Sequence, residues 1–167
     1  MKILVTGAEG FTGRHLIEML KKMKCSFHAL KSDLTDKHAL IAELSEVKPT
    51  HVIHLAGISS VTHEDLDAFY KINLFGSLNL LEALKTIPIK PKSILLASSA
   101  NIYGNADVCF IDETVRPNPQ NHYAMSKLAM EYMSKPYLVY LPIFYVRPFN
   151  YTGTGQSSEF VISKIKT

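Results

Sequence analysis

Short apolar runs alternate with helical patterns along the whole chain, and this alternation restricts the fold more than any other feature. The first run, residues 3–5, is rich in branched aliphatic side chains and stops at Thr6-Gly7, which is typical of a buried parallel strand. Further strands are expected at residues 26–30, 51–56, 93–97 and 138–146. Helices are expected from about residue 12, from 35 or 36 to 47, from 64 to 85 and from 122 to 133. Such alternation requires right-handed crossovers and a mostly parallel sheet with helices on both faces.

Length and charge limit the kinds of protein to which this chain can belong. The chain has 167 residues, of which 47% are hydrophobic, enough for one buried core and short for two ordinary domains. Its 18 Lys and Arg residues form no basic block and exceed the 15 Asp and Glu residues only slightly, so neither nucleic acid nor an anionic membrane is expected as a partner. No segment approaches the roughly 20 apolar residues of a membrane span, and the N-terminal apolar run is too short for a signal peptide. We expect a cytoplasmic chain whose Cys25 and Cys109 form no disulfide.

Three glycines follow the first strand at regular spacing, Gly7, Gly10 and Gly13. In a loop between a strand and a helix, the first glycine permits a tight turn and the second lets the backbone approach a pyrophosphate. The third lets the helix pack against the strand, while free N–H groups at the start of the helix face the anion. A glycine-rich turn without a ligand is the alternative, but the position after an N-terminal strand favours a dinucleotide site.

A tyrosine and a lysine stand four residues apart, Tyr123 and Lys127, so a helix places them one turn apart on the same face. A free tyrosine has a pKa of about 10, and an adjacent ammonium group favours the phenolate and moves the phenol toward a useful acid–base range. A packed tyrosine beside a solvated lysine is the alternative interpretation. The segment at residues 98–104 favours the catalytic one, because it begins with Ser98-Ser99 at the carboxyl end of an expected strand, where open α/β sheets bind ligands.

Together these motifs resemble the extended branch of the short-chain dehydrogenase/reductase superfamily, the NAD-dependent epimerase/dehydratase family, over essentially the whole chain. The resemblance is carried by residues 6–13 (T-G-x-x-G-x-x-G), Leu55-Ala56-Gly57, Asn73, residues 98–104 (S-S-x-x-x-Y-G) and residues 147–150 (R-P-F-N). Residues 157–162 are most similar to the members that act on GDP-linked deoxyhexoses. The resemblance implies a Rossmann-like, doubly wound fold, NAD or NADP as cofactor, and a nucleotide sugar as substrate.

The same resemblance assigns the site residues. It implies Ser99, Tyr123 and Lys127 as the catalytic set. It implies cofactor contacts from Gly7, Gly10, Phe11, Gly13, Lys31, Asp33, Leu34, Leu55, Ala56, Gly57, Asn73, Ala97, Ser98, Tyr123, Lys127, Pro148 and Phe149. The substrate is expected to contact Ser99, Asn101, Tyr123 and Asn150. No metal site is expected, because His51 and His54 lie three apart on a strand and so point to opposite faces.

The resemblance also restricts the reaction. Tyr123 would give or take a proton, and Lys127 would hold the ribose hydroxyls of the cofactor. Sugar 4,6-dehydratases carry an acid two residues after the catalytic hydroxyl residue, whereas this chain has Asn101 there, so a 4-keto-sugar reductase or an epimerase is favoured. A role of His122 as an auxiliary base is the less favoured alternative to a capping or surface histidine.

Two features depart from the family pattern. Lys31 and Ser32 stand where an acid for the ribose hydroxyls of NAD is expected. Lys31 suits the 2′-phosphate of NADP, but Glu9 argues against it, so both cofactors stay open. Extended members are also much longer, which makes residues 1–150 the expected NAD(P)-binding domain and residues 151–167 the start of a largely missing substrate-binding region. A truncated, non-catalytic dinucleotide-binding module with a regulatory or redox-sensing role is the alternative function.

A homodimer is the expected assembly. The helices at residues 64–85 and 122–133 resemble the pair that forms a four-helix contact in this superfamily. A separate C-terminal half is a further candidate partner.

Overall fold

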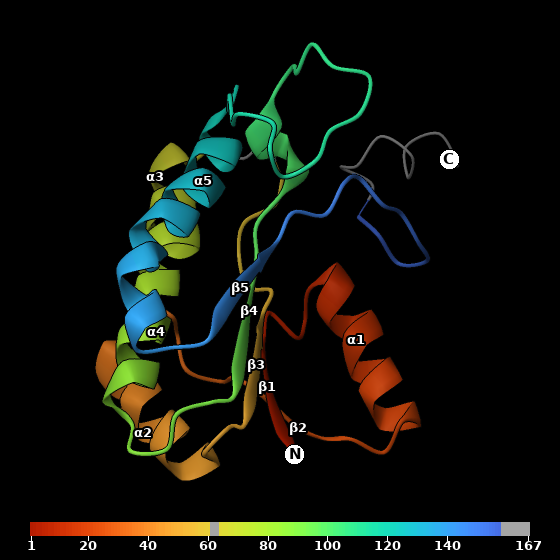
Figure 1. The fold of residues 1–167 in the computed structure, drawn as a ribbon. Helices are drawn as coiled ribbons and strands as arrows, with labels where there is room; N and C mark the ends of the chain where they lie inside the picture. Colours follow the sequence, from red (N-terminus) through yellow and green to blue (C-terminus); the bar gives the residue numbers. More distant parts are fainter. Residues whose placement is uncertain (61–63, 158–167) are drawn as a thin grey trace.

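Five short strands lie side by side in one parallel sheet within residues 1–60 and 64–157, the part of the chain that the computed structural model describes (Figure 1). In chain order they are β1 Lys2–Thr6, β2 Ser26–Ala29, β3 His51–His54, β4 Ser93–Ala97 and β5 Ile143–Val146. Their order across the sheet is β2-β1-β3-β4-β5, and every neighbouring pair is parallel. The predicted mostly parallel sheet is therefore confirmed.

Helices cover both faces of this sheet, as predicted (Figure 1). One face carries α1, Phe11–Lys22, and the other carries α2, Lys37–Val47, α4, Ser77–Thr86, and α5, His122–Ser134. Right-handed crossovers explain the division, because the first crossover runs toward one edge of the sheet and all later ones run toward the opposite edge. The direction reverses beside β1, so the carboxyl ends of β1 and β3 flank the kind of crevice in which open α/β sheets bind ligands. The Rossmann-like fold is confirmed.

Two apolar clusters hold the layers together. The larger one lies between the sheet and α2, α4 and α5, and its fully buried side chains include Leu40, Leu44, Leu80, Leu84 and Ile94. The smaller one lies under α1 and contains Ile3, Val5 and Leu20. Full burial of one such side chain contributes roughly 1.5 to 3 kcal/mol, so the leucine-rich cluster beneath three helices supplies most of the apolar stabilisation.

Side-chain caps fix where two of the helices begin. The Asp36 carboxylate accepts the N–H of Ala39 at 2.9 Å, which selects Asp36 rather than Thr35 as the cap of α2. The Asn121 side chain accepts the N–H of Ala124 at 2.8 Å at the start of α5. This second cap places Tyr123 in the first turn of α5, next to the strand ends.

The helical region after residue 64 differs from the single long helix that the pattern predicts. A short helix, α3 Leu66–Ala68, leads into a π-helical stretch, Phe69–Gly76, and only then into α4. The Ser77 hydroxyl donates to the carbonyl oxygen of Asn73 at 2.7 Å, near the end of the π-helical stretch. Widened turns of this kind are often found at functional sites, and apolar periodicity does not distinguish them from an α-helix.

The last strand is also shorter than predicted. Residues 138–146 were expected to form a strand, but a 3₁₀ turn occupies Lys135–Val139 and pairing begins only at Ile143. Two prolines explain the difference: Pro136 fixes its φ angle at the start of the turn, and Pro142 has no N–H to donate to a sheet. Among the described residues, no helix has the length and apolar character needed to cross a membrane.

Candidate functional site

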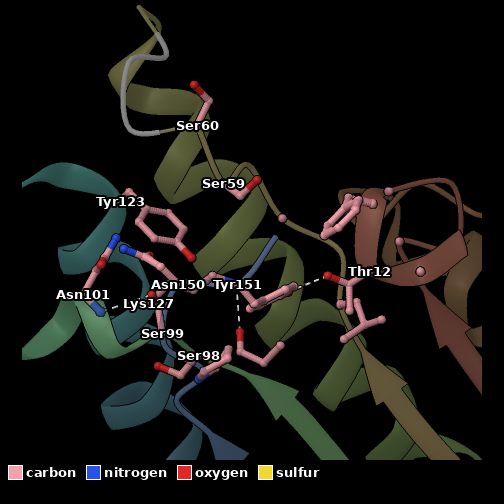
Figure 2. A pocket seen from close by; sticks show the side chains of 18 of the residues that line it. Thr12, Ser59, Ser60, Ser98, Ser99, Asn101, Tyr123, Lys127, Asn150 and Tyr151 are labelled. Carbon is pink, nitrogen blue, oxygen red and sulfur yellow. Dashed lines mark hydrogen bonds between the residues drawn. The ribbon is translucent and has the colours of Figure 1, made fainter. Parts of the chain in front are cut away.

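A cavity of about 470 Å³ lies over the carboxyl ends of the strands (Figure 2). Its walls come from the glycine loop, the segment after β3, the end of β4, α5 and the segment after β5. The predicted site residues that line it are Gly7, Gly10, Phe11, Gly13, Leu55, Gly57, Ala97, Ser98, Ser99, Asn101, Tyr123, Lys127, Pro148, Phe149 and Asn150. The fold thus brings together motifs that are far apart in the sequence.

Five predicted residues do not line this cavity. Leu34 is buried in the main core, and Lys31 and Asp33 are exposed just beyond the carboxyl end of β2. Ala56 and Asn73 are next to lining residues but do not line the cavity: the N–H of Ala56 donates to the Thr6 hydroxyl, and the Asn73 side-chain oxygen accepts the N–H of Ile58. The adenine and ribose contacts expected from Lys31, Asp33 and Leu34 therefore lie outside the cavity.

Other lining residues were not predicted. They are Thr12, Ser59, Ser60, Tyr151, Thr152 and Gln156. Thr12 lies within the glycine motif, so its position there could have predicted that it lines the cavity. No sequence pattern indicates that the segment after β5 turns back toward α1.

The glycine loop is shaped by close backbone approaches. Gly7 has a φ of +69°, and a Cβ atom there would lie 2.6 Å from the backbone nitrogen of Ala56. A Cβ atom at Gly13 would lie 2.1 Å from the carbonyl oxygen of Gly7. Only glycine fits either position. Because the first turn of a helix leaves its N–H groups without intrahelical acceptors, the start of α1 can hold an anion.

A buried histidine connects this loop to the π-helical stretch. The Thr6 hydroxyl accepts the N–H of Ala56 at 3.1 Å and bonds to His54 Nδ1 at 2.6 Å. On the other side of the ring, His54 Nε2 bonds to the Ser77 hydroxyl at 2.7 Å. Burial, followed by the charge of Lys127, lowers the pKa of His54 to about 3, so this histidine stays neutral. Among the described residues no group of three or more His, Cys, Asp or Glu side chains could hold a metal ion.

Asn73 braces the cavity wall and does not line it. Its amide nitrogen donates to the carbonyl of Ile58 at 3.0 Å and to the Ser126 hydroxyl at 3.1 Å, and its oxygen accepts the N–H of Ile58 at 2.8 Å. A Cβ atom at Gly57 would lie 2.8 Å from this oxygen and 3.1 Å from Lys127 Nζ. Asn73 therefore fixes the segment after β3 against α5, and Gly57 leaves the space that this contact needs.

The side chains of Tyr123, Lys127 and Ser99 meet at one end of the cavity (Figure 2). Burial raises the pKa of Tyr123, while a hydrogen bond from Ser99 lowers it and the neighbouring Tyr151 raises it further. Lys127 is only 5% exposed, and burial lowers its pKa to about 8. Its ammonium group donates to the carbonyl of Ala97 at 2.9 Å. The pKa of Tyr123 therefore moves upward, opposite to the direction expected from the adjacent ammonium, because burial outweighs the neighbouring groups.

Ser98 presents a buried hydroxyl to the same cavity. The residue is 3% exposed, and its Oγ has no hydrogen-bond partner among the described residues. Buried polar atoms nearly always have a partner, so this oxygen fits a ligand group in the cavity. Together with the glycine loop and the Lys127 ammonium, it makes these residues compatible with a bound nicotinamide dinucleotide.

A buried ion pair holds the cavity wall on the β5 side. The Arg147 guanidinium donates to both carboxylate oxygens of Glu131, at 3.0 and 2.7 Å, and to the Tyr103 hydroxyl at 2.8 Å. These bonds join α5, the turn after Ser99 and the end of β5. Arg147, the first residue of the R-P-F-N motif, therefore has a structural role: its charge-assisted hydrogen bonds hold Pro148 beside the strand ends.

The end of β2 is held by a single carboxylate. Glu43 accepts the backbone N–H groups of Lys31 and Ser32 at 2.9 and 2.8 Å, and it also bonds to the Ser32 hydroxyl and to His28. Burial alone would raise the pKa of Glu43, but the bonds from Ser32, His28 and the backbone outweigh it and lower the pKa to about 2.

The chain is similar to enzymes that modify nucleotide sugars. It is 36% identical to the GDP-6-deoxy-D-talose 4-dehydrogenase of Aggregatibacter actinomycetemcomitans, over 99% of this chain and 58% of that enzyme. It is also 36% identical to the GDP-6-deoxy-D-mannose reductase of Pseudomonas aeruginosa, over 97% of this chain and 56% of the relative. The chain therefore spans little more than half the length of these relatives.

Solved structures show the same fold at comparable coverage. The structure of RMD from Pseudomonas aeruginosa complexed with NADPH superimposes with a TM-score of 0.86 at 34% identity, over 98% of this chain and 59% of that one. The Thermus thermophilus UDP-glucose 4-epimerase in complex with NAD gives a TM-score of 0.83 at 31% identity, over 95% of this chain and 58% of that one. The profile of the family described as NAD dependent epimerase/dehydratase matches residues 3–167. The chain belongs to the NAD-dependent epimerase/dehydratase family.

Proposed function

We propose that the cavity binds NAD or NADP and that the protein acts on a nucleotide sugar, as a 4-keto-sugar reductase or an epimerase. The observation that carries the proposal is the meeting of Ser99, Tyr123 and Lys127 in the same cavity as the glycine loop. Relatives named for GDP-6-deoxyhexoses support a GDP-linked deoxyhexose as the substrate class.

The side chains divide the chemistry between them. When bound, a nicotinamide supplies the hydride donor or acceptor. Tyr123 holds a proton at its phenolic oxygen, and its raised pKa keeps that proton in place near neutral pH, as is needed for a general acid that protonates the sugar oxygen during reduction. Ser99 orients the same sugar oxygen through a hydrogen bond. With a pKa of about 8, Lys127 is mostly protonated at neutral pH and can donate to the ribose hydroxyls.

The presence of Asn101 favours reduction or epimerisation over dehydration. It follows Ser99 by two residues, and its backbone N–H donates to the Ser99 hydroxyl at 3.2 Å. The amide side chain lines the cavity but has no basic oxygen with which to remove a proton from carbon. Reduction and epimerisation need no such base, and both are compatible with the residues present.

The binding step can be tested without turnover. The fluorescence of NADH or NADPH reports binding directly, because the reduced nicotinamide is excited at wavelengths that protein side chains do not absorb. We expect Tyr123→Phe to keep dinucleotide binding and to abolish the exchange of hydride between the dinucleotide and GDP-6-deoxyhexoses or their 4-keto forms. Turnover by this variant at the parent rate contradicts the proposed role of Tyr123.

A non-catalytic dinucleotide-binding module is the second candidate, because the glycine loop and the unpartnered Ser98 hydroxyl in the cavity support dinucleotide binding without requiring turnover. This alternative predicts dinucleotide binding with no sugar-dependent change in NAD(P)H, by the parent and the Tyr123 variant alike. Binding of neither NADH nor NADPH contradicts both candidates.

We also propose a homodimer formed through α5 and the helical region Leu66–Thr86. Large apolar side chains are exposed on this helical layer, including Leu66, Phe75, Met125, Tyr132 and Met133. Large exposed apolar patches mark interaction sites on soluble proteins. Sedimentation that finds only monomer at high concentration contradicts the dimer.

A further inference from the structure

The segment after β5 crosses the cavity and attaches to the start of α1. Residues 151–156, here called the strap, leave the wall formed by Pro148 and Asn150 and reach the opposite wall at Thr12 (Figure 2). The Tyr151 hydroxyl bonds to the Thr12 hydroxyl at 2.5 Å. The Tyr151 ring also stacks on Phe11, with 6.1 Å between the ring centroids.

Two backbone contacts hold the far end of the strap to the same helix. The Arg14 guanidinium donates to the carbonyl of Gly155 at 2.9 Å, and His15 Nε2 donates to the carbonyl of Thr154 at 3.0 Å. Within the strap, the side-chain amide of Gln156 donates to the carbonyl of Tyr151 at 3.2 Å. All external anchors of the strap thus fall within the first turns of α1, where the glycine loop ends.

The strap also forms part of the cavity wall. Tyr151 and Gln156 line the cavity together with Gly10 and Gly13. The side-chain oxygen of Gln156 is buried and has no hydrogen-bond partner among the described residues, so it is available to accept a bond from a ligand. A ligand in the cavity therefore contacts both the strap and the strand ends, and the strap is fastened to α1 by the contacts at Thr12 and Arg14.

The strap is lightly packed, as an opening element must be. Tyr151 is 51% exposed although its hydroxyl and ring both contact the glycine loop. Arg14 and His15 are also exposed. Segments with few buried contacts open at low free-energy cost, and release of product or cofactor limits the turnover of many enzymes.

We propose that the strap retains a bound nicotinamide dinucleotide, with Tyr151 as its latch on Thr12, and that its opening sets the rate of dinucleotide release. The inference rests on the proposed function, because it names how the same cavity holds its cofactor. It bears on the choice between the two reactions: a reductase must exchange its dinucleotide at every turnover, whereas an epimerase can keep it.

The test measures release rates. The full chain is loaded with NADH and mixed with lactate dehydrogenase and pyruvate, which oxidise free NADH, and the loss of bound NADH fluorescence is followed. Loss of one hydrogen bond corresponds to about a 2- to 12-fold change in rate. We expect Tyr151→Phe, which keeps the ring and removes the hydroxyl, to speed release by about this factor, and Arg14→Ala to act in the same direction.

Matched controls separate the strap from general effects of substitution. Tyr140 is 56% exposed and lies far from the cavity lining, so Tyr140→Phe should release NADH at the parent rate. Lys21→Ala removes another exposed cation from α1 and serves the same purpose for Arg14. A double variant of Thr12→Val and Tyr151→Phe should release NADH no faster than the faster single variant, because the two hydroxyls share one bond.

Three outcomes overturn the proposal. Release at the parent rate by both Tyr151→Phe and Arg14→Ala shows that the strap does not retain the ligand. Faster association with unchanged release shows that the latch obstructs entry. If the parent binds neither NADH nor NADPH, the proposed function is contradicted as well. If it binds them and the release rates are unaffected by the substitutions, only the proposed role of the strap is contradicted.

Discussion

Lys127 carries its charge in a buried position, and we expect Lys127→Met to stabilise the ligand-free chain at neutral pH. Lys127 is 5% exposed, and its ammonium group donates to the carbonyl of Ala97. Burial lowers its pKa from 10.5 to about 8. Since one pKa unit corresponds to about 1.4 kcal/mol, keeping this group charged costs the folded state about 3 kcal/mol. Loss of the bond to Ala97 offsets about 1 kcal/mol.

The net gain expected from Lys127→Met is therefore about 1 to 2 kcal/mol, or a rise in Tm of roughly 2 to 8 °C for a chain of this size. Its pH dependence follows from linkage. Between pH 8 and 10.5 the unfolded chain binds more protons at residue 127 than the folded chain does, so the stability of the parent rises with pH across this window. The methionine variant lacks this titration, so its advantage should be complete below pH 8 and lost near pH 10.5.

Thermal unfolding of parent and variant across this pH range tests the reasoning. Lys21→Met, at an exposed position of α1, is the control and should show no such pH-dependent difference. The same methionine variant should bind NADH less tightly, because it lacks the ammonium that we propose as the donor to the ribose hydroxyls. The electrostatic argument fails if Lys127→Met is less stable than the parent at pH 7, or if the difference between the two does not change with pH.

Two further substitutions test the glycine loop and the end of β2. Gly13→Ala places a Cβ atom 2.1 Å from the Gly7 carbonyl oxygen, so we expect it to destabilise the chain by about 1 to 3 kcal/mol and to weaken NADH binding; parent-like binding in a fluorescence titration contradicts this. Glu43→Gln should cost about 1 to 3 kcal/mol at pH 7, and the parent should lose this stability as pH falls from 4.5 toward 2, because its folded pKa is lowered. Equal denaturant midpoints for parent and Glu43→Gln at pH 7 contradict the latter.

The sheet and its helices could be predicted because their signals are local. Runs of branched residues and amphipathic spacing identify the strands and α1, α2 and α5 without knowledge of their neighbours. The π-helical stretch Phe69–Gly76 could not be predicted, since it depends on contacts of Asn73 with residues far away in the sequence. The short β5 could have been predicted more closely, because Pro136 and Pro142 are visible in the sequence.

The cavity was predicted in part for a similar reason. The glycine spacing indicates a loop, and the Tyr123–Lys127 spacing indicates that the two side chains share one helix face. The upward direction of the Tyr123 pKa depends on burial, which the spacing of two residues does not reveal. The return of residues 151–156 to α1 is a tertiary contact, and the sequence carries no local signal for it.

The bonds of His54 have a consequence for how the site responds to acid. Because the pKa of His54 is about 3, its ring stays neutral at physiological pH. Its hydrogen bonds to Thr6 and Ser77 therefore keep the same donor and acceptor directions. The hydrogen bonds of His54 that connect the glycine loop to the π-helical stretch and the start of α4 therefore do not change on mild acidification. A pH dependence of dinucleotide binding near neutral pH therefore does not originate at His54.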